Sequence, residues 1–160
     1  MEQIDLQSPT NKVITFYSDM VYKLALAKCK NTEDAEDVFQ EVFLRYIKKN
    51  PQFTDEEHRK AWLIRVTINC SNKSLTSPWR KRTEKITEDI YVKDNYSNEL
   101  YYELLKLPEK YREVIHLYYY QDMSVDEIAN ALGKRSSSIR TRLARARQLL
   151  KKFMREEDYV

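Results

Sequence analysis

The chain contains one glycine, Gly133, and only four prolines in 160 residues. Tight β-hairpin turns depend on glycine, and strand-rich folds need many turns, so this composition disfavours a protein built on hairpins. Apolar residues instead recur at helical spacing along most of the chain. The sequence therefore predicts an all-α fold.

The stretch from 107 to 153 has the pattern of three consecutive helices. Ser124 followed by Glu127 is a capping box that begins the second helix. Gly133 ends that helix, because glycine readily adopts the left-handed conformation of a sharp turn. Ala129 is small enough for two helices to approach closely, so the pattern predicts a helix-turn-helix. The inner face of the last helix is expected to carry Ile139, Leu143, Ala146 and Leu150.

The last helix of this motif is strongly basic. Nine lysines and arginines and no acid occur from Lys134 to Arg155. A free face of short hydroxyls and arginines suits a DNA major groove lined by phosphates. A solvated basic face would show a similar charge pattern, but its coincidence with the capping box and the glycine turn favours DNA binding. The DNA-contacting residues predicted on this helix are Ser136, Ser137, Ser138, Arg140, Thr141, Arg142 and Arg145.

Helical patterns also occupy the N-terminal half of the chain. They are predicted at 11–30, 33–49 and 57–75. Phe16 is expected in the apolar stripe of the first helix, and Thr32 is expected to cap the second. The outer face of the second helix carries Glu36, Asp37, Gln40 and Glu41. The outer face of the third carries Arg65, Asn69, Asn72 and Lys73. Taken alone, both polar faces are also typical of solvated helices.

A change of composition separates the two helical parts. From 77 the chain becomes basic and then polar and mildly acidic, without a sustained period, which is typical of a flexible linker. A helical pattern resumes at 99. We therefore predict two small helical modules joined by a flexible linker. Their predicted bounds are 10–76 and 99–155, with the linker at 77–98.

The sequence lacks the residue patterns of several classes of catalytic and metal-binding site. The sequence has no CxxC, no HExxH, no phosphate-binding loop and no cluster of catalytic carboxylates. We therefore expect no catalytic residues, no metal site, no cofactor and no enzymatic activity. Cys29 and Cys70 are expected to be buried thiols in a reducing compartment. No signal sequence or long apolar run is present, so a cytoplasmic protein is predicted.

Three parts of the C-terminal half resemble region 4 of bacterial RNA polymerase sigma factors: LPEKYREVIHLYY from 107, MSVDEIANALG from 123 and SIRTRLARARQLLKK from 138. Two strings in the N-terminal half, DAEDVFQEVFLRYI at 34–47 and AWLIRVTINCSNKSL at 61–75, resemble region 2. The chain is thus similar to the extracytoplasmic-function group of the sigma-70 superfamily over roughly 12–75 and 99–153. Arg135 stands where that family usually has a capping Ser or Thr, so the cap is expected to shift to Ser136.

The resemblance implies an alternative sigma factor that promotes transcription initiation. The last helix would recognise the −35 promoter element through the set named above. Residues Arg65, Asn69, Asn72 and Lys73, together with the loop at 51–55, would hold the −10 element. Residues Glu36, Asp37, Gln40 and Glu41 would bind core RNA polymerase. An anti-sigma protein is implied as a regulatory partner, without membrane insertion of this chain.

Other functions fit parts of the sequence. A helix-turn-helix regulator that binds duplex DNA independently of polymerase would explain residues 107–153 equally well. It would leave the acidic face at 36–41 without a role. A DNA-acting enzyme with an appended reader lacks catalytic residues, and a helical adaptor without nucleic acid leaves the basic helix unexplained.

Overall fold

Every regular element in residues 3–76 and 99–157, which are the residues that the computed structural model describes, is a helix. The all-α prediction is thus confirmed. The chain divides into two compact units, Met1–Arg82 and Thr83–Val160. The segment predicted as a linker, 77–98, lies outside the described residues.

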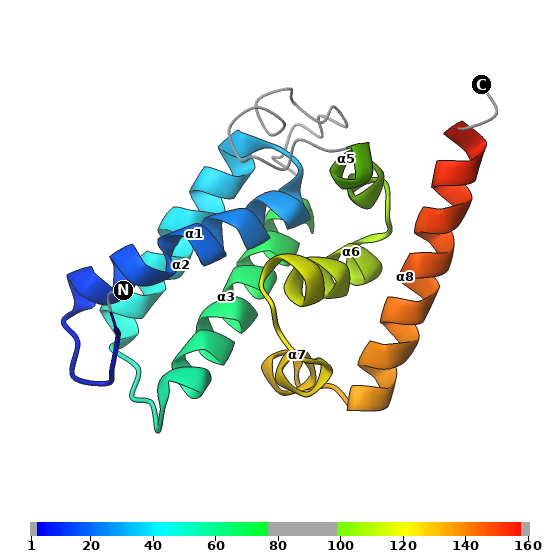
Figure 1. Cartoon of the computed structure of the whole chain (residues 1–160). Coiled ribbons are helices and arrows are strands. Elements are labelled where there is room, and N and C mark those ends of the chain that lie inside the picture. Colours follow the sequence, from blue (N-terminus) through cyan, green and yellow to red (C-terminus); the bar gives the residue numbers. More distant parts are fainter. Residues whose placement is uncertain (1–2, 77–98, 158–160) are drawn as a thin grey trace. The chain divides into compact units, whose positions relative to one another are not determined.

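The N-terminal unit is built from three helices: α1 (Thr10–Cys29), α2 (Thr32–Lys49) and α3 (Glu56–Thr76). Each helix packs against the other two (Figure 1). Burying a large aliphatic side chain contributes roughly 1.5–3 kcal/mol, so their shared core holds the unit together. The side chains fully excluded from solvent in this core are Val13, Val21, Leu24, Ala25, Leu26, Ala35, Val42, Leu63 and Ile64.

Phe16 departs from the predicted stripe, because its side chain is 46% exposed. Tyr17, the next residue along α1, is buried instead. The Phe16 ring packs against the Tyr17 ring edge to face, with centroids 4.8 Å apart. Phe16 therefore lies at the margin of the core, where a helical period alone does not separate buried from exposed positions.

The residue predicted to cap α2 is not the one that caps it in the structure. Asn31, not Thr32, is the N-cap of α2, and its side chain accepts a hydrogen bond from the backbone N–H of Asp34. Lys30 reverses the chain with a φ of 65°. Asn50 and Asp122 also have positive φ values. These polar residues occupy positions where glycine is usual, which explains how so many helices are connected with one glycine.

The C-terminal unit contains α5 (Glu99–Leu105), α6 (Glu109–Ile115), the π-helix η1 (His116–Tyr120), α7 (Val125–Leu132) and α8 (Ser136–Glu157). Figure 1 shows α8 as a long helix with α5, α6 and α7 along one side, and each of the three contacts it. The inner face of α8 is close to the prediction, since Ile139, Leu143 and Ala146 are buried and Leu150 is partly buried.

The predicted helix-turn-helix signals are confirmed. Ser124 and Glu127 form the reciprocal hydrogen bonds of a capping box at the start of α7. Gly133 follows α7 with a φ of 64° and a ψ of 37°, the left-handed conformation expected of it. The π-helix was not predicted. Within it, Leu117 is fully buried while Tyr118 is only partly buried.

Replacing Gly133 with alanine is expected to destabilise the C-terminal unit by about 1 kcal/mol, because the left-handed conformation costs an L-residue roughly 1–2 kcal/mol. Crowding is not the cause, since a Cβ at this position would meet nothing within 4 Å. Gly133→Asn should cost less, because asparagine tolerates this conformation. Urea denaturation of the wild type and the two variants measures the order of their free energies of unfolding. Equal losses for the two variants would contradict a backbone origin.

Candidate nucleic-acid and protein interfaces

The N-terminal half of α8 displays the residues predicted to contact DNA. Five of them are exposed and the other two, Ser136 and Arg142, are partly buried. Ile139 and Leu143 on the opposite side are buried, so packing of the apolar face determines which side chains face solvent. The exposed members of the set are Ser137, Ser138, Arg140, Thr141 and Arg145.

The hydroxyl groups of this set are not equivalent. The hydroxyl of Ser136 donates to Oδ1 of Asp126 at 2.6 Å, which joins the first turn of α7 to the first residue of α8. The hydroxyl of Thr141 donates to the carbonyl of Ser137 at 3.0 Å. Both retain lone pairs with which to accept a hydrogen bond, but their protons are already used.

The expected shift of the α8 cap to Ser136 is wrong. The carbonyl of Arg135 accepts the backbone N–H groups of Ser138 and Ile139, at 3.0 and 3.2 Å. Arg135 therefore occupies the N-cap position, and α8 begins at Ser136. The Ser136 side chain is drawn to Asp126 instead, a contact between two helices that local sequence does not reveal.

The arginines of α8 divide into two groups. In the part of the chain that the structure describes, Arg140, Arg142 and Arg145 form no ion pair. Arg147 is held instead: its Nε donates to the Tyr119 hydroxyl at 2.8 Å, and its guanidinium lies 5.7 Å from the Tyr118 ring. The first group is available to phosphates or base edges, whereas Arg147 fastens α8 to η1.

The exposed face of α3 brings together the four residues predicted for the −10 element. Residues 65, 69, 72 and 73 are spaced so that they share one side of a helix, and all four are exposed. Asn72 also has a partner beneath the surface, since its Oδ1 accepts from Nζ of the buried Lys28 at 2.7 Å. Sequence reasoning missed Lys28, because it is 44 residues away from Asn72.

The loop that precedes α3 is held by an aromatic cluster. The Phe53 ring packs 6.4 Å from that of Tyr46 and 6.1 Å from that of Trp62. Asp55 accepts the backbone N–H of His58 at 2.7 Å and so acts as an N-terminal cap for α3. The loop predicted to assist the −10 face is therefore anchored at its centre and at its end.

A partly buried ionic cluster links the start of α3 to α1. Arg59 is 4% exposed and pairs with Glu56, while its Nη1 also donates to the backbone carbonyl of Asp5 at 3.2 Å. The other oxygen of Glu56 accepts from the Tyr17 hydroxyl at 2.8 Å. Burial, followed by this hydrogen bond and the charge of Glu56, raises the pKa of Tyr17 above its ordinary value.

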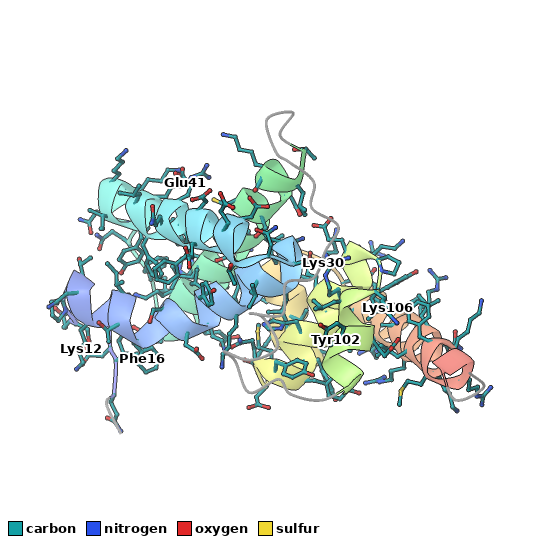
Figure 2. The ribbon with its side chains drawn as sticks, turned by 90° about the horizontal axis from the view of Figure 1, so that it is seen from above. Lys12, Phe16, Lys30, Glu41, Tyr102 and Lys106 are labelled. Atoms are coloured by element: carbon teal, nitrogen blue, oxygen red, sulfur yellow. The ribbon has the colours of Figure 1, made fainter. Side chains whose placement is uncertain are left out.

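The acidic face of α2 lies beside a groove. Glu36, Asp37, Gln40 and Glu41 are all exposed, and Figure 2 shows Glu41 among the side chains that project from α2. The groove, about 420 Å³ in volume, is lined by residues of both α1 and α2. Sequence reasoning included only two of its lining residues, because the others come from α1 or the apolar stripe. The groove is lined by Ser18, Asp19, Tyr22, Glu36, Phe39 and Gln40.

Within 3–76 and 99–157, no group of three or more His, Cys, Asp or Glu side chains is placed to hold a metal ion. In the same ranges no helix is long and apolar enough to span a membrane. Cys29 and Cys70 are both buried, as predicted, and neither forms a disulfide among the described residues. Burial raises the pKa of Cys70, which makes this thiol less reactive.

Two family models match the chain in succession. Residues 13–81 match Sigma-70 region 2, and residues 97–150 match Sigma-70, region 4. The first range contains most of α1 and all of α2 and α3. The second contains α5, α6, η1, α7 and the larger part of α8. The acidic face of α2, the polar face of α3 and the basic face of α8 therefore all lie within matched regions.

Curated relatives match nearly the whole chain. The ECF RNA polymerase sigma factor SigW of Bacillus subtilis is 29% identical over 168 residues, covering 90% of this chain and 88% of SigW. The RNA polymerase sigma factor SigV of the same organism is 26% identical, with coverage of 91% and 90%.

Solved structures share the fold. CnrH, in a complex with the cytosolic domain of CnrY, has a TM-score of 0.72 at 22% identity, covering 92% of this chain and 88% of CnrH. The sigma factor RpoE of Bartonella quintana, in a complex with the anti-sigma factor NepR, has a TM-score of 0.69 at 20% identity, covering 91% and 96%.

Replacing Tyr17 with phenylalanine is expected to destabilise the N-terminal unit by about 1–3 kcal/mol near neutral pH, because a buried hydrogen bond to a carboxylate is lost. The pKa of Tyr17 is raised in the folded state. Its stabilising contribution is therefore complete below the unfolded pKa of about 10 and is lost as the pH rises through the folded value. Urea denaturation at about pH 8 and about pH 11 measures this. The difference in the free energy of unfolding between the wild type and Tyr17→Phe should be smaller at the higher pH. A difference that does not change with pH would contradict the stabilising role assigned to the Tyr17 hydroxyl.

Proposed function

Because the chain belongs to the sigma-70 family of RNA polymerase sigma factors, in the extracytoplasmic-function group, we propose that its two helical modules divide promoter recognition between them. The chain is an alternative sigma factor: it binds core RNA polymerase, recognises −35 and −10 promoter elements and promotes transcription initiation. In our proposal the module at 10–76 serves core polymerase and the −10 element, and that at 99–155 serves the −35 element.

The observation that carries this function is the presence of both sigma regions in one chain, in the family's order. A helix-turn-helix regulator that acts without polymerase would account for the C-terminal unit alone. It leaves the match to region 2 and the acidic face of α2 unexplained. A sigma factor function accounts for both units, so we prefer it.

The basic face of α8 is the proposed −35 reader. Arg140, Arg142 and Arg145 offer forked N–H donors that fit guanine edges and phosphates. Ser137 and Ser138 are exposed and suit either phosphate or base contacts. Ser136 and Thr141 fit as acceptors only, because their hydroxyl protons are engaged within the unit. A donor such as a cytosine or adenine amino group is the partner that these two oxygens require.

The polar face of α3 is the proposed −10 surface. Asn69 and Asn72 can hydrogen-bond to the exposed edges of unpaired bases, while Arg65 and Lys73 can neutralise the phosphates beside them. The anchored loop at 51–55 lies at the start of the same helix. A rigid loop supports recognition of a single strand, because less conformational freedom is lost when the strand binds.

The acidic face of α2 is the proposed site for core polymerase. Glu36, Asp37 and Glu41 would attract a basic surface and fix its register, a role for exposed charges that depends on salt. The neighbouring groove supports this proposal, since it places Asp19 of α1 and the ring of Phe39 beside Glu36. Core binding would also hold the two DNA-binding modules at a fixed spacing, which converts two weak contacts into one strong one.

An anti-sigma protein is the proposed regulatory partner. RpoE is seen with its anti-sigma factor NepR, and CnrH with the cytosolic domain of CnrY. Leu44 and Ile47 on α2, 48% and 54% exposed, give the acidic face an apolar border that such a partner could cover. We further propose that the chain acts in the cytoplasm, where the polymerase is, and that RNA synthesis itself is catalysed by the core enzyme.

Run-off transcription from a library of DNA fragments tests the function directly. Purified bacterial core polymerase is assayed with and without the full chain. Transcripts that require the chain and share −35 and −10 elements at a fixed spacing are the expected result. If none appears and the chain alone shifts duplex DNA at nanomolar concentration, the independent regulator becomes the better account.

Replacing Arg140 or Arg142 with alanine is expected to weaken −35-dependent transcription by about 1–3 kcal/mol, or roughly 5- to 150-fold, if the side chain contacts a base. Core binding, measured by pull-down, should be unchanged. Arg155→Ala is the matched control, since this exposed arginine lies on α8 about 20 Å beyond Arg142. Loss of core binding in the Arg140 or Arg142 variants would contradict the assignment.

Reversing the charges of Glu36 and Asp37 to lysine is expected to weaken core association about tenfold at low salt and to make it less sensitive to salt. Glu57→Lys, at an exposed position in the first turn of α3, controls for a charge change elsewhere in the same unit. Titration of labelled core polymerase at two salt concentrations gives both quantities. An unchanged affinity would contradict the proposal that α2 forms the interface with core polymerase.

A further inference from the structure

Lys28 is a buried lysine whose amine reaches a residue of the proposed −10 surface. Its side chain is 1% exposed, and it lies in the last turn of α1. Its Nζ is 2.7 Å from Oδ1 of Asn72 on α3. Asn72 itself is exposed, on the same face as Asn69 and Lys73. Lys28 therefore supports, from inside the unit, a side chain that faces solvent.

The chemistry of lysine determines which end of the amide is turned inward. A protonated amine donates three hydrogens and accepts none, so its partner must be the amide oxygen. The oxygen and nitrogen of an asparagine are otherwise hard to distinguish, and this contact removes the ambiguity. With its oxygen held, Asn72 has its NH₂ group, a pair of donors, to offer to an outside partner.

We propose that Lys28 is a positioning residue for the −10 strand: it orients Asn72 so that the amide NH₂, rather than the oxygen, meets the nucleic acid. This inference rests on the function proposed above for the exposed face of α3. Partners that suit two donors are base carbonyl oxygens, ring nitrogens and phosphate oxygens. Base amino groups require an acceptor and are disfavoured there.

Orientation affects binding because an unheld asparagine can rotate about its last bond and present either atom. A charge-assisted hydrogen bond from a buried amine removes that freedom before the strand arrives. Asn69 offers an internal comparison, one turn earlier on the same face. Within the described residues, the Asn69 side chain has no hydrogen bond that would orient it.

The test is a double-mutant cycle in holoenzyme assembled from core polymerase and the full chain. The probe is fork-junction DNA that is duplex through the −35 element and carries a single-stranded non-template −10 segment, taken from a promoter selected by run-off transcription. Lys28→Met removes the donors and keeps a buried stem. It is expected to weaken probe binding about tenfold. Asn72→Ala should lose a similar factor, and the double variant should bind no more weakly than Asn72→Ala alone.

Asn69→Ala provides the matched control for the cycle. Adding Lys28→Met to Asn69→Ala should multiply the two losses, because Lys28 does not act through Asn69. Lys28→Arg keeps donors at this position and should recover part of the binding. Core affinity of every variant should equal that of the wild type, which separates positioning from loss of fold. If Lys28→Met does not fold, Lys28→Gln, whose amide can present either atom to Asn72, replaces it in the same cycle.

The possible outcomes separate this inference from the proposed function. If Lys28→Met binds the probe as well as the wild type, or if its loss multiplies with that of Asn72→Ala, Lys28 does not act through Asn72. The inference is then overturned while the −10 surface stands. If Asn72→Ala alone has no effect on the probe, Asn72 is not part of that surface, and the inference and this residue assignment fail together. Failure to obtain any selective transcript would instead contradict the proposed function as a whole.

Discussion

Both units depend on the burial of one apolar face of each helix. In α8, Ile139 and Leu143 are packed inward, and the 3.6-residue period then directs Arg140 and Arg145 to solvent. The same constraint leaves the acidic residues of α2 and the asparagines of α3 on outer faces. The packing that stabilises each unit therefore also selects the side chains through which it can bind DNA or protein.

Features set by a few neighbouring residues could be predicted from the sequence. The capping box of Ser124 and Glu127 and the left-handed turn at Gly133 depend only on local chemistry, and both were found as expected. The choice between adjacent polar residues was harder. Asn31 and Thr32 are both good caps, and the sequence offers no means of knowing that Asn31 also donates to the backbone carbonyl of Cys29.

Polar contacts between distant residues could not be predicted. Lys28 meets Asn72, Arg59 reaches the carbonyl of Asp5, and Arg147 meets Tyr119, across 44, 54 and 28 residues respectively. A helical pattern marks such residues only as polar, or as exceptions within an apolar stripe. Their partners depend on how the helices cross, and this packing cannot be read from the periodic pattern of a single sequence. The candidate faces were therefore predictable, whereas the contacts that support them were not.

The attachment of α8 at two points has a consequence for how it would discriminate among DNA sequences. Ser136 ties its first turn to Asp126, and Arg147 ties its fourth turn to Tyr119. These two contacts oppose rotation of α8 about its axis, and such a rotation would be needed to recover contacts with an altered base pair. An altered base pair would then leave a hydrogen-bond donor or acceptor of the interface unsatisfied. The resulting loss of affinity would make a rigid helix more selective among DNA sequences. Relaxed promoter choice would thus arise as readily from loosening either attachment as from changing a residue that contacts DNA.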